Sequence, residues 1–146
     1  MDFMTALDVA SSGMKAQRDY MNVISMNMAN AQTTRTSDGG PYRRKSVSFE
    51  SSPVLSPFDS AMQDQMNRDL QGVAVRGIVN DSRPFRYVYD PGHPDSNQQG
   101  YVAYPDINVV EEMTNMVNAM RSYEANAQSI QDVKSMFNKA LAIGRG

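Results

Sequence analysis

The residues best suited to chemistry lie in a turn rich in proline and glycine. His93, the only histidine of the chain, stands between Asp90 and Asp95, and an imidazole with two carboxylates is a plausible ligand set for a divalent metal ion. A lone histidine flanked by Pro91 and Pro94 is far more often structural or solvated. We therefore expect no metal, no cofactor and no catalytic residue, and an enzyme at this turn would require stoichiometric metal binding in a titration.

A second candidate is the basic run Arg43, Arg44 and Lys45, which follows Tyr42 in the pattern of a strand that binds nucleic acid. The chain has 14 Lys or Arg against 16 Asp or Glu, a formal net charge of -2, and no strongly basic region. Binding to a phosphate backbone depends on many cationic contacts. We therefore expect no nucleic-acid partner, and a solvated or protein-facing edge at this run.

Membrane insertion and secretion leave patterns that this sequence lacks. It has no run of 18 or more apolar residues, so no transmembrane helix and no direct membrane insertion are expected. Asp2 and Asp8 bracket a short mixed segment without the basic and apolar regions of a cleavable signal peptide. Cysteine is absent, which excludes disulfides and thiolate metal sites and is compatible with reducing or oxidising compartments.

The longest segment without proline or glycine runs from Ile107 to Ile143 and predicts one long helix. Its apolar residues recur in steps of four and three, interrupted at Lys134, which is the pattern of a coiled-coil seam. At about 1.5 Å per residue the helix would be roughly 55 Å long, so it needs a partner outside a compact core. Acidic residues near its start and basic residues near its end complement the helix dipole, and Gly144 supplies a stop. The candidate interface positions are Val109, Met113, Met116, Met120, Tyr123, Ile130, Phe137 and Leu141.

A second helix with the same spacing is predicted from Phe3 to Met28, with Gln17 as its single polar seam position. Gly13 costs this helix roughly 1 kcal/mol relative to alanine, so propensity alone does not hold it. Leaving such a stripe in water forgoes roughly 1.5 to 3 kcal/mol for each large apolar side chain. The two seams should therefore bury each other or the seams of other chains. The candidate interface positions here are Leu7, Met14, Met21, Ile24 and Met28.

Residues 33–105 have a different composition, rich in turn and strand residues. Gly39 and Gly40 followed by Pro41 predict a turn with positive φ. Alternating apolar residues then predict a small set of strands, and Gly77 is expected to mark a bulge. Glu50 to Pro57 is expected to be a loop, and the spacing of Phe58, Met62, Met66 and Leu70 indicates a short amphipathic helix. The predicted strands are Tyr42–Phe49, Gly72–Val79, Phe85–Tyr89 and Tyr101–Tyr104.

The expected fold is therefore mainly α with a small β-rich insert. Long N- and C-terminal helices, residues 1–32 and 106–146, form a coiled coil and flank a β-rich domain of residues 33–105, which contains a variable loop at 51–71.

Three blocks of sequence, in order, resemble a known family. The first, residues 21–49, reads MNVISMNMANAQTTRTSDGGPYRRKSVSF; the second contains PFRYVYDPGHPD; the third contains INVVEEMTNMVNAMRSYEANAQSIQ. The chain resembles the axial proteins of the bacterial flagellum, in particular their proximal-rod members. The family's N-terminal motif maps onto Asn27, Ala29, Asn30 and Thr33, and its C-terminal motif onto Arg121, Tyr123, Glu124, Ala125 and Asn126. The chain departs from the family at 51–71, which is longer and richer in Ser, Pro and Met.

The resemblance implies a structural subunit of the proximal rod, not an enzyme. It implies polymerisation through the terminal helices into a torque-transmitting drive shaft around an export channel. Its partners would be other rod proteins, further copies of itself in a helical assembly, and the flagellar type III export apparatus. It would be exported without a cleaved signal peptide and reside in the basal body, in the rod that crosses the periplasm. Asn27 and Asn30 join the expected interface on this basis. The alternative is an adaptor or secreted effector that binds one partner helix through the same seams.

Overall fold

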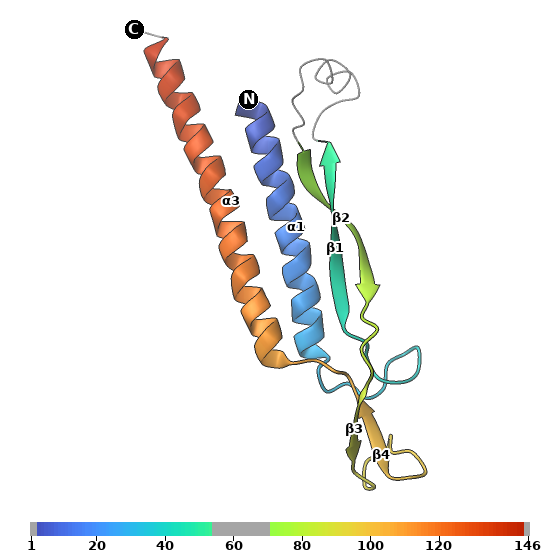
Figure 1. Ribbon diagram of the computed structural model, residues 1–146. Helices are drawn as coiled ribbons and strands as arrows, with labels where there is room; N and C mark the ends of the chain where they lie inside the picture. The colour runs from blue at the N-terminus through green and yellow to red at the C-terminus, as the bar shows by residue number, and fades with distance from the viewer. Residues whose placement is uncertain (1–2, 54–70, 145–146) are drawn as a thin grey trace.

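The computed structural model describes residues 3–53 and 71–144, which form an elongated molecule with two long helices and two β-hairpins (Figure 1). In chain order the elements are α1 (Phe3–Ala29), β1 (Lys45–Pro53), β2 (Gln71–Asn80), β3 (Arg86–Tyr89), β4 (Tyr101–Tyr104) and α3 (Val109–Ile143). Two terminal helices thus flank a small antiparallel strand region, as predicted. The division into three domains stays a prediction.

The helix α1 lies between α3 on one side and the β1–β2 hairpin on the other (Figure 1). The two helices run antiparallel, so the start of α1 and the end of α3 lie at the same end of the molecule. The rings of Phe3 and Phe137 meet edge to face there, with their centroids 5.8 Å apart. Because α1 packs on two sides, it buries Ala16 and Val23 as well as the predicted Ile24. A single seven-residue repeat describes one face only, which is why Ala16 and Val23 were not predicted.

The start of α3 is defined by Asn108, which was not among the predicted helix-capping residues. Its Oδ1 accepts hydrogen bonds from the backbone N–H groups of Val110 at 3.0 Å and Glu111 at 3.4 Å. An asparagine in this position satisfies amides that have no partner inside the helix. Glu111 and Glu112 occupy the first turn, as predicted, whereas the last described turn carries no basic residue. Of the basic residues predicted near its end, Lys134 and Lys139 lie before this turn, and Arg145 lies outside the described residues.

The predicted stop at Gly144 is confirmed. Its N–H donates to the carbonyl of Ala140 at 3.1 Å, and its φ of -74° is right-handed. The glycine thus ends α3 without the left-handed conformation that such a cap often uses.

A glycine inside α1 allows the two helices to approach closely. A Cβ atom at Gly13 would lie only 2.9 Å from the Nδ2 atom of Asn126 on α3. That distance is shorter than ordinary van der Waals contact, so a larger residue at position 13 must displace Asn126. The intrinsic helix cost of Gly13 is therefore compensated by close packing at this crossing.

The β1–β2 hairpin confirms the predicted bulge. Ser48 pairs with Gly77, whereas Phe49 pairs with Val75, so Arg76 is the extra residue of β2. The predicted loop at Glu50 is wrong for 50–53, because these residues pair with the backbone of 71–74. Such pairing supplies hydrogen-bond partners that local composition does not reveal. The strand predicted from Tyr42 begins instead at Lys45, and the helix predicted on 58–70 lies outside the described residues.

The β3–β4 hairpin carries the turn that contains His93. β4 matches its predicted bounds, and β3 begins one residue after the predicted start. The Nδ1 atom of His93 accepts the N–H of Asp95 at 3.1 Å, and the Asp95 carboxylate accepts the Thr34 hydroxyl at 2.8 Å. These side chains therefore shape the turn. In residues 3–53 and 71–144, no three His, Cys, Asp or Glu side chains cluster as a metal ion would need.

Gly39 and Gly40 have φ of +84° and +81°, which confirms the predicted turn before Pro41.

Candidate assembly interface

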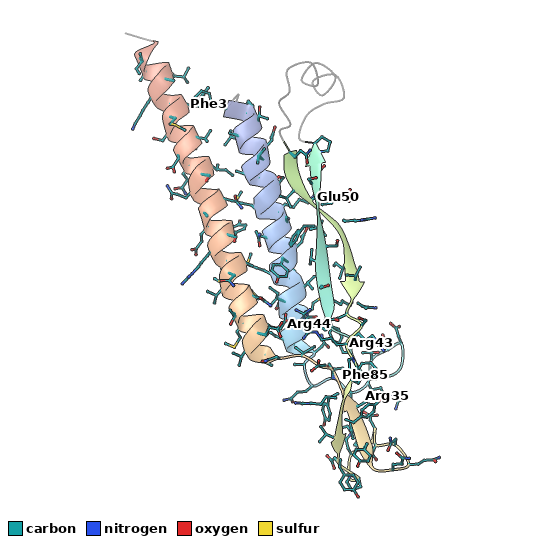
Figure 2. All side chains as sticks on the ribbon, in the orientation of Figure 1. Phe3, Arg35, Arg43, Arg44, Glu50 and Phe85 are labelled. Atoms are coloured by element: carbon teal, nitrogen blue, oxygen red, sulfur yellow. The ribbon has the colours of Figure 1, made fainter. Side chains whose placement is uncertain are left out.

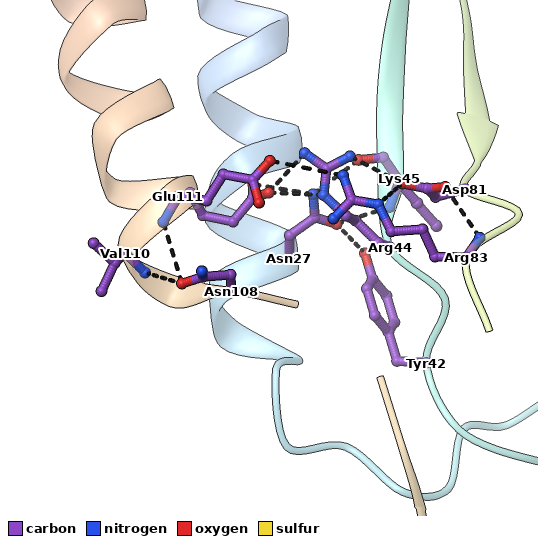
Figure 3. A network of polar contacts seen from close by, with 10 residues as sticks. Asn27, Tyr42, Arg44, Lys45, Asp81, Arg83, Asn108, Val110 and Glu111 are labelled. Carbon is purple, nitrogen blue, oxygen red and sulfur yellow. Dashed lines mark hydrogen bonds and ion pairs between the residues drawn. The ribbon is translucent and has the colours of Figure 1, made fainter. Parts of the chain in front are cut away.

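Polar side chains from α1, α3 and the insert meet where the two helices approach β1 (Figure 3). We call Asn27, Tyr42, Arg44, Asp81 and Glu112 the junction cluster. Asn27 is only 1% exposed. Its Nδ2 donates to the Lys45 carbonyl at 2.8 Å and to Glu112 at 3.3 Å, while its Oδ1 accepts from the Lys45 N–H at 2.9 Å and the Tyr42 hydroxyl at 3.1 Å. All hydrogen-bonding positions of the amide are used, so Asn27 joins α1 to both β1 and α3.

Arg44 and Glu112 form the charged centre of the junction cluster. The guanidinium Nε and Nη2 atoms lie 2.8 and 2.7 Å from the Glu112 Oε1 atom, and Nη1 lies 3.3 Å from Asp81. The side chains of Glu112 and Arg44 are 1% and 13% exposed. Charges removed from water in this way are stable only while both partners remain, because either one alone would be left unpaired.

A second arginine extends the junction cluster along the surface. Arg83 lies 3.1 Å from Asp81 and 3.7 Å from Glu111, and its side chain is half-exposed. The chain segment after β2 is thereby linked to the first turn of α3. Because these outer contacts face water, they stabilise the arrangement less than the Arg44–Glu112 pair does.

The surroundings change the pKa values of several groups in the junction cluster. Burial raises the pKa of Tyr42, and the negative charge of Glu112 raises it further, so the hydroxyl stays a neutral donor. The pKa of Asp81 is raised by partial burial, but the Arg83 N–H and the charges of Arg83 and Arg44 outweigh this and bring it below 3.8. Asp81 is therefore fully charged at neutral pH.

Most of the junction cluster could not be found from spacing. Asn27 was predicted through the family resemblance, but Arg44 and Glu112 are 68 residues apart in the chain. The basic run was predicted to be solvated or to face protein, and its two arginines differ in this respect. Arg44 is enclosed, whereas the neighbouring Arg43 is exposed and places its guanidinium 4.4 Å from the centre of the Phe85 ring (Figure 2).

The apolar positions predicted as an interface are divided between packed and exposed surfaces. Ile24 is buried with Asn27, and eight of the other thirteen predicted positions are partly buried. The partly buried positions are Leu7, Met14, Met21, Met28, Asn30, Met116, Tyr123 and Ile130. The exposed positions are Val109, Met113, Met120, Phe137 and Leu141. Packing inside one chain therefore leaves a substantial part of the predicted seam uncovered.

The seam of α3 divides because its period differs from that of a straight helix. A seven-residue repeat drifts by about 20° in each heptad of an α-helix with 3.6 residues per turn. Val109 and Met113, at the start, are 43% and 56% exposed, whereas Ala119, outside the predicted seam, is 2% exposed. Farther along, Tyr123 and Ile130 are half-buried. At the start of α3 the seam residues therefore lie beside the surface that contacts α1. Only near the middle of the helix do they face α1.

An apolar groove opens at the end of the molecule away from the junction cluster. Phe3, near the start of α1, marks this end in Figure 2. The groove has a volume of about 300 Å³. We call it the end groove. It is lined by Lys134 and by the apolar residues Phe3, Met4, Leu7, Ile130, Val133 and Phe137.

Known families match both terminal regions. Residues 7–35 match the family described as flagella basal body rod protein, and residues 98–143 match the C-terminal region described for the flagellar basal body rod FlgEFG proteins. The two matches cover α1 from Leu7 onward with the turn that follows it, and β4 with α3.

Curated relatives match the whole length of the chain. The flagellar basal-body rod protein FlgC of Borreliella burgdorferi is 44% identical, with 100% of both chains covered. The FlgC of Bacillus subtilis is 41% identical over 96% of this chain and 97% of its own. The FlgC of Salmonella typhimurium is 37% identical over 99% of this chain and 100% of its own. The chain therefore belongs to the FlgC family of flagellar basal-body rod proteins, whose members are structural rod subunits and not enzymes.

Proposed function

We propose that this chain polymerises through its terminal helices, with copies of itself and with other rod proteins, into a helical tube. The observation that carries the proposal is the row of exposed apolar positions on α3, among them Met113 at 56% and Leu141 at 54%. Large apolar side chains aligned on one helix are typical of a protein-binding surface. The tube would transmit torque and surround an export channel.

Coiled-coil pairing between subunits would use the half of the α3 seam that α1 leaves uncovered. A heptad seam stays in register with a partner only when the two helices wind around each other. The packed half of α3 is held by α1, and the exposed half is available to a neighbouring subunit. The twelve methionines of the chain, many of them in the terminal helices, suit contacts that are repeated in slightly different geometries.

The junction cluster suits a subunit that carries torque. It joins α1, α3 and β1 through hydrogen bonds between 2.7 and 3.3 Å. Paired and fully hydrogen-bonded buried groups have few alternative arrangements. A force applied to the helices would therefore reach the β-rich insert with little internal rotation.

We also propose that the flagellar type III export apparatus secretes the chain without a cleaved signal peptide. The chain would then reside in the rod that crosses the periplasm. Membership of the rod family supports this location. In the described part of the chain, neither α1 nor α3 is long and apolar enough to span a bilayer.

The test is a polar substitution in the end groove with a matched control on the next residue. Ile130→Asp places an unpaired carboxylate in an apolar groove, while Gln131→Asp places one on the exposed face of the same turn. We expect Ile130→Asp to abolish motility and incorporation into basal bodies, and Gln131→Asp to retain both. Circular dichroism of the purified proteins should show similar strand content. If Ile130→Asp swims as well as the parent, these helices are not the assembly interface, and a monomeric adaptor becomes the better interpretation.

A further inference from the structure

A polar pocket with a volume of about 610 Å³ opens on the β-rich insert beside the junction cluster. One wall is the loop 36–41, and the other residues that line it come from the start of β1, the end of β2 and the segment before β3. We call it the basic pocket, because Arg43 and Lys45 line it together with Tyr42, Asn80 and Phe85. These two cations belong to the basic run that was predicted to be solvated or to face protein.

Each cation of the basic pocket lies against an aromatic ring and not against a carboxylate. The Arg43 guanidinium carbon lies 4.4 Å from the centre of the Phe85 ring (Figure 2), and the Lys45 Nζ atom lies 5.9 Å from the centre of the Tyr42 ring. Neither cation forms an ion pair with another described residue. A ring face attracts a cation but does not neutralise it. Both charges therefore stay available to a partner.

One carboxylate borders the basic pocket, but it does not cancel this charge. Asp38 is exposed, and within residues 3–53 and 71–144 it forms no ion pair with Arg43 or Lys45. Two cations against one carboxylate leave an excess of positive charge. The basic pocket therefore favours an anionic ligand.

Backbone and side-chain hydrogen bonds fix the walls of the basic pocket. The N–H of Thr36 donates to the Gly40 carbonyl at 2.9 Å, and the N–H of Gly39 donates to the Thr36 carbonyl at 3.1 Å. On the other side, the Tyr42 hydroxyl donates to Asn27 in the junction cluster at 3.1 Å. A site formed in advance loses little conformational freedom when it binds. A partner held here would also be connected through Tyr42 to both helices.

We propose that the basic pocket binds an acidic segment of another rod protein, whose Asp or Glu side chains pair with Arg43 and Lys45. The inference rests on the proposed assembly with other rod proteins and adds one surface through which it occurs. Carboxylates match the donors of a guanidinium and an ammonium group. A nucleic acid is a poorer fit, because its phosphate backbone binds through many cations and the basic pocket offers two.

The described surface of this chain does not supply a matching acidic segment for a second copy. Arg43 and Lys45 are two residues apart, whereas the exposed carboxylates that form no ion pair in the described part of the chain are at least eight residues apart in sequence. These carboxylates belong to Asp8, Asp38, Asp90, Asp106, Glu124 and Asp132. Two closely spaced carboxylates therefore come more readily from a different protein.

Carbodiimide cross-linking of purified basal bodies tests directly for a carboxylate at Lys45. The reagent activates a carboxylate, and the deprotonated Nζ atom attacks its carbon. An amide bond then forms, and one carboxylate oxygen leaves with the reagent as a urea. We expect mass spectrometry to find Lys45 linked to an Asp or Glu of a different rod protein. Lys45→Arg, which keeps the charge but has no amine, should lose this link and retain motility.

The linked peptides distinguish the possible partners. A link from Lys45 only to Asp38 of its own chain, or only to another copy of the chain, would overturn the proposal. No link at Lys45 in basal bodies that contain the chain would also overturn it and would leave the rod function intact. Absence of the parent chain from basal bodies would instead contradict the proposed function itself.

Removal of the charges tests the same contact without a reagent. An exposed ion pair changes a binding constant by up to about fivefold, so Arg43→Gln should lower incorporation into basal bodies by up to this factor. Adding Lys45→Gln to the same chain should lower it further. Arg76→Gln is the matched control, because Arg76 is an exposed arginine of β2 that does not line the basic pocket, and it should leave incorporation unchanged. Urea unfolding of the purified chains should give similar midpoints for all these variants and the parent. Normal incorporation of the chain that carries both Arg43→Gln and Lys45→Gln would overturn the proposal.

Discussion

At the scale of single residues, burial separates neighbours that look alike in the sequence. Glu111 and Glu112 are adjacent acidic residues at the start of α3, yet the side chain of Glu111 is 44% exposed and that of Glu112 is 1% exposed. Arg43 and Arg44 differ in the same way. Each exposed member is thus an internal control for its buried neighbour.

Truncation of the buried glutamate should be strongly destabilising. Glu112→Ala leaves the Arg44 guanidinium largely enclosed without its main partner, and breaking a buried pair typically costs about 3 to 5 kcal/mol in the free energy of unfolding. Glu111→Ala removes only an exposed contact to Arg83 and should cost about 1 kcal/mol or less. Urea unfolding of the purified chains measures both values. Equal losses would mean that the Arg44–Glu112 pair does not stabilise the junction.

Asp81 should stabilise the fold at neutral pH and lose this effect in acid. Its folded pKa lies below the ordinary 3.8, because the Arg83 N–H and the two arginine charges outweigh the effect of burial. A carboxylate with a lowered pKa stabilises the folded state above its unfolded pKa, and this is lost as the pH falls through the folded pKa. The difference in unfolding free energy between the parent and Asp81→Asn should therefore be constant from about pH 5 to 8 and shrink below about pH 4.

The control for this titration is Asp38→Asn, which changes an exposed carboxylate in a loop. Its difference from the parent should stay small throughout the same range. A difference for Asp81→Asn that grows on acidification would contradict the assigned direction of the pKa change.

At the scale of elements, the close approach of α1 and α3 at Gly13 makes a prediction about coupling. Gly13→Ala alone gains helix propensity but pushes its Cβ against Asn126 Nδ2, so the two effects oppose each other. In an Asn126→Ala background the obstacle is gone, and Gly13→Ala should stabilise the protein by about 1 kcal/mol. A double-mutant cycle in urea unfolding gives the coupling between the two sites. Identical effects of Gly13→Ala in both backgrounds would show that the contact is unimportant.

The elements themselves could largely be predicted from local sequence. Both helices follow from apolar spacing and the absence of proline, and the β4 strand and the bulge beside Gly77 follow from alternation and a glycine. The extension of β1 through Pro53 could not be predicted, because its backbone partners come from Gln71 onward. The pairing of Arg44 with Glu112 has the same cause. Contacts between distant segments leave no local period.

The heptad pattern predicts which apolar residues form the candidate interface, but not which of them face α1 and which stay exposed. A heptad pattern identifies Met113 and Ile130 as members of one seam, although the former is 56% exposed and the latter lines the end groove. Which part faces α1 depends on the straightness of the helix and on where α1 ends. Those are properties of the packed pair, not of either helix alone.

At the scale of the whole molecule, stabilising contacts are distributed unevenly along its length. The junction end contains Val23, Ile24, Asn27 and Glu112, all 1% exposed. The open end has Phe137 at 47%, Leu141 at 54% and Ile143 at 81% exposed. Since α3 has 35 residues and α1 has 27, the last turns of α3 extend beyond their partner. A subunit with one fixed end and one uncovered end is suited to gain order from its neighbours.

Amide hydrogen exchange should reveal this asymmetry in the purified monomer. Amides of α1 around Val23 and Ile24 are expected to be strongly protected, because opening them breaks the junction cluster. Amides of α3 after Phe137 should exchange nearly as fast as in an unfolded chain, since ordering each residue costs about 1 to 2 kcal/mol in backbone entropy and little burial offsets it there. In purified basal bodies the same amides should become protected, because the end groove and the overhang are then covered. Uniform protection along α3 in the monomer would show that the open end is stable alone, and unchanged exchange in basal bodies would show that neighbouring subunits do not cover it.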